Sequence, residues 1–420
     1  MVKRLVLAGL LALLVAGNVV VTHDVLTAPH PGHNDFMSRW EGARSFWVDG
    51  LNPYGEEASL NIQKRIYGRA AVGTEDPGYF AYPFYVVFFL WSLSYVPYAW
   101  AAAIWMVLLE ACLIVSLFLI VDMYRWRPPL WIRAALVLWM LLVYFAARGL
   151  ILGQVGIVVY LFQALCLWAL ARERDTLAGV ALAFSTLKPQ MAFLLVPFLL
   201  LWALRARRQK VVGSFGLAFA VLMAASFLFL PSWLGDWIAQ VRLYPQYTAA
   251  AYPDTGSPVW ILFNYYLGLG AVGEWIMNLF FYGLMLWAWF TVLVQNRMER
   301  FMWVLMVTLA VTHLVVLRTA TTHFVVFVIP LIFYLQLITR RARRRGYLWV
   351  LGILLASLVS TWTHFLLTVR DSLEHPTLFL PATFGMLILL WFTRKAWWHS
   401  EPVIMPGSPA TTTVRAGGGS

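Results

Sequence analysis

Long apolar stretches alternate with shorter polar ones along most of this chain. A helix needs about 20 apolar residues to cross a bilayer, and fewer where it is buried in protein. The sequence therefore predicts an all-α polytopic membrane protein with about twelve transmembrane helices. The predicted spans are residues 5–22, 98–122, 131–147, 153–171, 175–187, 189–204, 211–230, 273–294, 301–317, 322–339, 346–367 and 377–393.

The composition agrees with this pattern. Hydrophobic residues make up 61% of the chain and charged residues 12%, and the mean hydropathy is +0.74. Soluble proteins are about half apolar and a quarter charged. The 22 Trp and 18 Tyr residues suit the aromatic belts of membrane interfaces. Cys112 and Cys166 lie in apolar runs and predict buried small side chains rather than a disulfide.

Residues 24–78 form a polar segment that no span can absorb. Such polar surface cannot lie in hydrocarbon, so we expect a structured loop on the membrane surface. The segment carries eight of the 19 carboxylates of the chain: Asp24, Asp35, Glu41, Asp49, Glu56, Glu57, Glu75 and Asp76.

The apolar run 79–95 decides the predicted orientation. If this run lies in the interface instead of spanning, most of the 31 Lys and Arg residues fall on one side of the membrane. Basic residues mark the cytoplasmic side, so we predict a multi-pass protein of the cell membrane whose site faces outward. The +12 net charge then reflects topology, and no nucleic-acid partner is expected.

In this arrangement residues 1–400 form one transmembrane domain. Residues 24–97 are its outer loop, with interfacial helices, and residues 401–420 are a disordered cytoplasmic tail. The basic and apolar N-terminus, 1–18, is expected to remain as the first span rather than to be cleaved.

Asp35 is the candidate catalytic residue of the outer loop. It follows the first span closely, and a carboxylate held just above the membrane can accept a proton from a sugar hydroxyl. The alternative is a helix N-cap for residues 36–48, a common role of Asp. His30 and His33 could ligate a metal with Asp35, but their spacing is generic, so no metal and no cofactor is predicted.

Several polar residues interrupt apolar runs at the predicted outer boundary. An unpaired charge there is costly and usually functional, and these donors suit a lipid phosphate. The alternative is snorkelling to lipid headgroups. His313 lies inside a span and is interpreted as a core histidine. The residues at the outer boundary are Arg148, Gln154, Lys188, Arg318 and His323.

A series of short motifs resembles glycosyltransferase family 87, the polyprenol-phosphate-mannose-dependent α-mannosyltransferases of the GT-C superfamily. Where this family often has Tyr-Pro-Pro, the chain has Tyr82-Pro83-Phe84. The motifs are Asn34-Asp35-Phe36 with Trp40 and Ala43, Gly50-Leu51-Asn52-Pro53-Tyr54, Tyr82-Pro83, Gly153-Gln154 and Leu187-Lys188-Pro189.

The resemblance implies a GT-C-like fold and an inverting transfer of a sugar, most often mannose, from a polyprenyl phosphate donor to a glycolipid or glycan acceptor. It implies Asp35 as the general base. We predict that Lys188, His323, Arg318 and Arg148 bind the donor phosphate. The predicted acceptor or sugar contacts are Asn34, Trp40, Asn52, Tyr54, Tyr82 and Gln154.

A transporter or flippase of a lipid-linked or anionic solute is the main alternative. Transporters place ionisable residues near mid-membrane on broken helices, whereas here the polar residues gather at one face beside a long loop. A scaffold without chemistry would leave the residues at positions 35, 188 and 323 without a purpose. The pattern therefore favours an enzyme.

Overall fold

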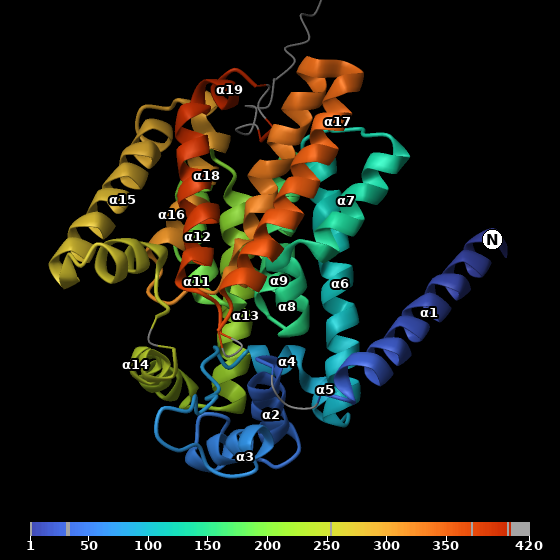
Figure 1. Cartoon of the computed structure of the whole chain (residues 1–420), viewed down its shortest axis with the longest axis vertical. Helices are drawn as coiled ribbons and strands as arrows, with labels where there is room; N and C mark the ends of the chain where they lie inside the picture. Colours follow the sequence, from blue (N-terminus) through green and yellow to red (C-terminus); the bar gives the residue numbers. More distant parts are fainter. Residues whose placement is uncertain (1, 31–33, 253, 371–372, 401–402, 405–420) are drawn as a thin grey trace, which may run out of the picture.

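The computed structural model describes residues 2–30, 34–252, 254–370, 373–400 and 403–404, and it is helical throughout (Figure 1). Within these residues the only β pairing is a single bridge between Arg370 and Leu373. The predicted tail lies outside the described residues apart from 403–404, as does His33. The helices are α1 (Val2–Thr22), α2 (Phe36–Trp47), α3 (Glu56–Tyr67), α4 (Val86–Phe89), α5 (Trp91–Ser94), α6 (Tyr98–Met123), α7 (Leu130–Leu142), α8 (Tyr144–Ile151), α9 (Gly156–Ala171), α10 (Asp175–Phe184), α11 (Pro189–Ala192), α12 (Leu195–Arg205), α13 (Gln209–Phe229), α14 (Trp233–Ala251), α15 (Gly270–Leu293), α16 (Phe301–Val315), α17 (Val328–Thr368), α18 (Leu380–Phe392) and α19 (Arg394–Trp398).

Seven helical segments are long and apolar enough to cross a membrane, which confirms an α-helical polytopic membrane protein. The predicted span 131–147 is instead a bent pair, α7 and α8, which meet at 54° around the extended residue Val143; counting this pair as one span gives eight. The remaining predicted spans correspond to four shorter apolar helices, so the count of twelve stays a prediction. The seven segments are Ala8–Thr27, Tyr98–Met123, Gln209–Phe229, Gly270–Leu293, Met298–Val315, Thr321–Ala342 and Arg344–Thr368.

Helix α17 contains two of these segments and reverses direction between them. A Cβ atom on Gly346 would lie 2.7 Å from the Thr339 Cα, whereas residues seven apart in a straight helix are separated by about 10 Å. Glycine permits this close approach. The arginine-rich residues 340–345, between two predicted spans, therefore join two antiparallel segments. This turn lies at the end of the molecule opposite α2 and α3 (Figure 1).

The run 79–95 contains no helix long enough to span, in agreement with the prediction. It forms only the single-turn helices α4 and α5, which pack beneath α2. Two indoles of α2 fix this packing. Trp47 Nε1 donates to the Val87 carbonyl at 3.0 Å, and Trp40 Nε1 donates to the Leu93 carbonyl at 2.9 Å.

Residues 231–258 lie between two predicted spans, and most of them form the helix α14. Trp233 and Trp237 are spaced one helical turn apart, and Trp233 is buried. Figure 1 shows α14 at the same end as α2 and α3. Asn52 Nδ2 donates to Asp236 Oδ2 at 2.8 Å, which ties the first loop to this helix. The first loop and α14 together form a cap on one end of the helical body.

Candidate active site

The Asp35 carboxylate lies at the junction of three elements. Asp35 directly precedes α2 and occupies its N-cap position. Its side chain makes no capping hydrogen bond, so the carboxylate does not stabilise the start of the helix. Instead, Gln154 Nε2 donates to Asp35 Oδ2. Asn34 Oδ1 accepts a hydrogen bond from the Tyr98 hydroxyl, and Tyr98 is the first residue of α6. The carboxylate is therefore held between α2, α6 and the turn after α8.

The turn that carries Gln154 requires a glycine. Gly153 has φ +64°, and a Cβ atom there would lie 2.6 Å from the Phe36 Cβ. The Phe36 amide donates to the Leu152 carbonyl at 3.2 Å, and Trp105 Nε1 donates to the Gly153 carbonyl at 2.9 Å. Contact between this turn and the start of α2 places the Gln154 amide beside Asp35.

Lys188 reaches the same amide from the other side. Its buried ammonium group donates to Gln154 Oε1 at 2.8 Å. Lys188 lies between the 3₁₀ turn Ser185–Leu187 and α11, which begins at Pro189. The Tyr85 hydroxyl donates to the Thr186 carbonyl at 3.0 Å and holds this break in place. The structure thus brings Lys188 and Asp35 together, as the sequence predicts.

Arg39, which the sequence analysis missed, is a second cation in the cluster. Its guanidinium donates to the Asp35 carbonyl and, at 3.1 Å, to the Tyr82 hydroxyl. Burial opposes the charge on Arg39, but Tyr82 and then Asp35 leave its pKa raised. Burial also raises the pKa of Tyr82, but the Arg39 and Lys188 cations outweigh it, and the Tyr82 pKa is lowered. The position of Arg39 one helical turn after Asp35 was the available signal.

Two buried histidines complete the polar cluster. His323 Nδ1 lies 3.2 Å from the Thr319 hydroxyl, while His323 Nε2 and both ring nitrogens of His313 have no partner among the described residues. The two rings are 6.0 Å apart. A Cβ on Gly156 would lie 3.4 Å from the His323 ring and 3.2 Å from Met191, three residues after Lys188. Unpaired buried nitrogens at such a place suit a ligand or water.

Charges of the Asp35 cluster act on acidic and phenolic groups of the cap. Burial, and then the Asp35 charge, raise the pKa of Asp76, although the Gly78 amide donates to it at 2.8 Å. Burial followed by the Tyr82 charge raises the pKa of Tyr244, on α14, to about 12. These groups are therefore electrostatically coupled to the Asp35 cluster.

Arg318 and Arg148 form their hydrogen bonds and ion pair outside the group formed by Asp35, Gln154 and Lys188. Arg318 donates to the Thr255 hydroxyl at 2.9 Å and to the Tyr252 carbonyl at 3.2 Å. Arg148 Nε forms an ion pair with Glu374 Oε1 at 2.8 Å. A role for these two arginines on the donor phosphate stays a prediction.

Three of the predicted acceptor contacts hold the first loop together. Trp40 is buried against α5, and Asn52 is bonded to α14 as described above. The Tyr54 hydroxyl donates to the Tyr82 carbonyl at 2.6 Å and so fixes the backbone of Tyr82. Asn34, Tyr82 and Gln154 are the predicted contacts that lie in the cluster itself.

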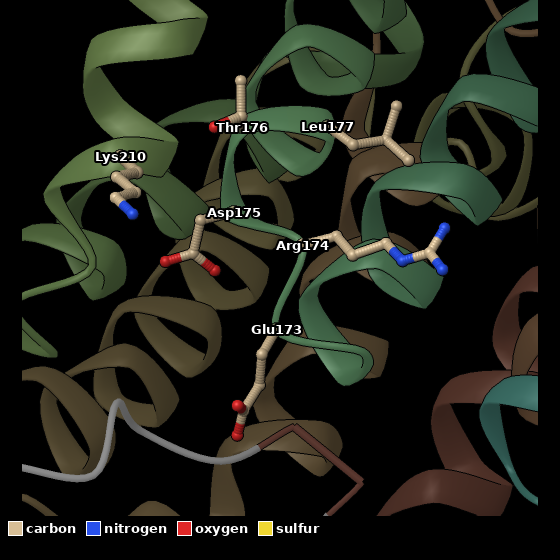
Figure 2. Close-up of a pocket in the computed structure, with 6 residues that line it drawn as sticks. All are labelled: Glu173, Arg174, Asp175, Thr176, Leu177 and Lys210. Atoms are coloured by element: carbon tan, nitrogen blue, oxygen red, sulfur yellow. The ribbon is translucent and has the colours of Figure 1, made fainter. Parts of the chain in front are cut away.

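A surface hollow of about 380 Å³ lies between the start of α10 and α13 (Figure 2). Asp175 begins α10, whereas Lys188 follows its far end, so the hollow belongs to the opposite end of this helix. Arg208 Nε donates to Asp175 at 2.9 Å, which ties the start of α10 to α13. The hollow is lined by Glu173, Arg174, Asp175, Thr176, Leu177 and Lys210.

No group of three or more His, Cys, Asp or Glu side chains within the described ranges is arranged to hold a metal ion.

These observations define a polytopic helical membrane protein in which a partly exposed carboxylate meets a buried amide and a buried ammonium group under a polar cap. Residues 80–318, more than half of the chain, match the model of Glycosyltransferase family 87, and the chain belongs to this family. It is therefore a membrane glycosyltransferase, which acts on a sugar donor and an acceptor. No curated protein and no solved structure matches the chain. The family match begins after Asp35 and ends at Arg318.

Proposed function

We propose that this glycosyltransferase is an inverting mannosyltransferase of the GT-C type. It transfers mannose from a polyprenyl phosphate donor to a glycolipid or glycan acceptor at the outer face of the cell membrane. The observation that carries the proposal is that Asp35 and Lys188 are bonded to opposite ends of one amide, Gln154. A proton acceptor and a cation are thereby fixed side by side.

This pair answers the two needs of the reaction. The acceptor hydroxyl must lose a proton as it attacks, and the departing phosphate gains charge. Asp35 accepts the proton while the acceptor oxygen bonds to the anomeric carbon from the face opposite the phosphate. The bond between that carbon and the phosphate oxygen breaks, and its electron pair leaves with the phosphate, which Lys188 stabilises. A β-linked donor then gives an α-linked product.

The hydrogen bonds of Asp35 leave one oxygen for this task. Gln154 donates to Oδ2, and Arg39 donates to the main-chain carbonyl, so Oδ1 accepts no hydrogen bond from the described part of the chain. Gln154 therefore orients the carboxylate without occupying the oxygen that would take the proton. This division supports Asp35 as the general base.

The donor phosphate is assigned to Lys188 and His323. Phosphate oxygens accept hydrogen bonds from ammonium and imidazole groups. The unpaired Nε2 of His323 provides one such donor. Arg318 and Arg148 are the further cations predicted for this role, and they are bonded to other groups here.

The two ends of the molecule support the proposed orientation. The cap with α2, α3 and α14 lies at one end, and the basic turn of α17 and the helix α19 lie at the other (Figure 1). Basic residues mark the cytoplasmic side, which puts the Asp35 cluster outside. Residues 1–400 then form one transmembrane domain with 24–97 as its outer catalytic loop.

The test is transfer by the purified protein from polyprenyl phosphate mannose to a total lipid extract, with the product read by mass and by digestion with α- and β-mannosidases. We expect an added hexose that only the α-mannosidase removes. A β-linked product would contradict the single displacement. Movement of the donor across a vesicle membrane without any glycosylated product would favour the flippase alternative.

A further inference from the structure

A second cavity, of about 240 Å³, lies between the end of α14, with Thr255, and the end of α17, with residues 373–376. It is smaller than the roughly 300–1,000 Å³ of pockets for drug-sized ligands, so it suits a ligand the size of a single ring. Its lining residues are Tyr252, Asp254, Thr255, Tyr265, Thr368, Arg370, Leu373, Glu374, His375 and Pro376.

The lining combines planar charged groups, hydroxyls and aromatic rings. Asp254 and Arg370 are exposed and carry opposite charges. Tyr252 and Tyr265 add phenol rings with an apolar face and a polar tip. With Glu374 paired to Arg148, the remaining charges of Asp254 and Arg370 balance, so the lining has no net positive charge that would favour an anion. Sugar hydroxyls both donate and accept hydrogen bonds, and sugar C–H faces pack on aromatic rings, so this lining fits a neutral carbohydrate.

In one wall of the cavity, the carboxylate of Glu374 is held in a fixed orientation. Its Oε1 accepts hydrogen bonds from the Tyr144 hydroxyl at 2.5 Å and from the Thr321 hydroxyl, and it forms an ion pair with Arg148 Nε at 2.8 Å. Its Oε2 takes part in none of these bonds, and only 10% of the side chain is exposed. A largely buried carboxylate held in this way can accept a hydrogen bond from a ligand hydroxyl without having to be reoriented.

Both walls of the cavity are tied to elements of the candidate active site. Arg318 donates to the Thr255 hydroxyl and to the Tyr252 carbonyl, and both of these residues line the cavity. On the other wall, the Thr321 hydroxyl donates to Glu374 and lies two residues before His323 of the Asp35 cluster. Burial, and then the Asp76 and Asp35 charges, also raise the pKa of Tyr252.

We infer that this cavity binds one neutral hexose of the acceptor glycan and so presents the next hydroxyl toward Asp35. The inference rests on the proposed function and adds to it the chemical class of the acceptor group and the place where it is held. Arg148 and Arg318 then act as positioning residues for its two walls.

The inference is tested by direct binding, without donor and without turnover. The full chain is placed in lipid nanodiscs, because sugar-based detergents would compete for the cavity. The probes are methyl α-mannoside, methyl α-glucoside and α-mannobiose, and binding is followed by saturation-transfer NMR. Asp254→Asn and Arg370→Gln remove the two charges from the rim of the lining, and Glu173→Gln and Arg205→Gln, both at exposed residues outside it, are the matched controls.

We expect saturable binding of at least one probe by the wild-type protein. Each cavity variant should weaken it by about 10-fold or more, the usual loss for one charge-assisted hydrogen bond, and the controls should leave it unchanged. Absence of saturable binding for all three probes would overturn the inference. Unchanged binding by both cavity variants would do the same, as would displacement of the sugar by inorganic phosphate.

The acceptor KM separates this inference from the proposed function. If Asp254→Asn and Arg370→Gln leave the acceptor KM unchanged while mannose transfer continues, the cavity inference is wrong and the proposed function stands. If sugar binding depends on both residues but polyprenyl phosphate mannose donates nothing, the proposed donor is wrong and the cavity remains a carbohydrate site.

Discussion

Phe36 and Gly153 pack so closely that a Cβ atom on Gly153 would lie 2.6 Å from the Phe36 Cβ. Phe36 follows Asp35, and Gly153 precedes Gln154. This backbone contact, between residues more than a hundred positions apart in the chain, therefore sets the distance from the carboxylate to its amide partner.

Gly153→Ala should destabilise the protein by about 1–3 kcal/mol, because alanine is strained at φ +64° and its methyl group has no room. Transfer activity should also fall, because Gln154 is displaced from Asp35. Thermal unfolding and initial rates measure the two effects. Gly283→Ala, on α15 with no neighbour within 4 Å, is the control and should lower neither, because alanine is favoured over glycine inside a helix. A Gly153→Ala protein with wild-type stability would contradict the packing argument.

Asp35→Asn should lower kcat by about 10²-fold or more while the donor KM stays near the wild-type value, because the amide keeps the shape and removes the base. Rates of mannose transfer at saturating donor test this. Asp49→Asn, at an exposed carboxylate of the same loop, is the comparison. Near wild-type turnover by Asp35→Asn would place the base elsewhere, with Asp49 and Asp236 the next candidates.

Lys188→Met keeps most of the side-chain volume and removes the cation. We expect kcat/KM for the donor to fall by about 10²-fold or more, the usual loss of one electrostatic contact to a developing charge. Lys64→Met, at an exposed lysine of α3, should leave kcat/KM unchanged. If Lys188→Met binds and uses the donor normally, Lys188 serves only to orient Gln154.

Tyr82→Phe should reveal a stability contribution that depends on alkaline pH. The pKa of Tyr82 is lowered from 10.0, so its contribution is fully present above pH 10 and is lost as the pH falls through the lowered folded value. The stability advantage of the wild-type protein over Tyr82→Phe should therefore grow as the pH rises toward 10.

Tyr54→Phe is the matched control for this pH dependence. Burial raises the pKa of Tyr54, so its contribution is present below pH 10 and is lost as the pH rises further. Thermal unfolding of the three proteins across alkaline pH should give opposite trends for the two variants. A flat difference for Tyr82→Phe would show that the two cations do not favour its phenolate.

Single-cysteine labelling tests the proposed orientation. Cys112 and Cys166 are buried, so they need not be removed. An impermeant maleimide added to intact cells should label Ala70→Cys, in the cap, and should not label Arg127→Cys until the membrane is opened. Both positions are exposed on the protein. Labelling of Arg127→Cys from outside would invert the topology and place the Asp35 cluster in the cytoplasm.

Hydropathy predicted the apolar segments, because length and composition control whether a helix can cross a bilayer. The distribution of basic residues predicted that the run 79–95 does not span. Hydropathy failed at Val143, where one predicted span bends, because a backbone bend leaves no mark on hydropathy. It also missed α14, since the polar residues among its aromatic side chains resemble a loop.

The sequence predicted Asp35, Gln154 and Lys188 at the same outer boundary, because Asp35 follows the first span closely and the other two interrupt apolar runs at that level. The sequence did not show which residues form ion pairs with each other. Arg148 looked unpaired until the fold brought Glu374, from a loop 226 positions later in the chain, against it. Arg39 was overlooked because it lies in a segment already rich in charge, where one more arginine carries no signal of its own.

Two hydrogen bonds and one ion pair on Glu374 Oε1 hold this wall of the second cavity in place, whereas the side chains of Asp254 and Arg370 on its rim form no hydrogen bond or ion pair with the described residues. Exchanging rim residues should therefore retune acceptor preference without loosening the body of the protein. Exchanging Glu374 would disturb Arg148, Tyr144 and Thr321 together. The acceptor preference of this enzyme can therefore change through substitutions at the rim of the cavity, whereas the contacts of Glu374 tolerate almost no substitution.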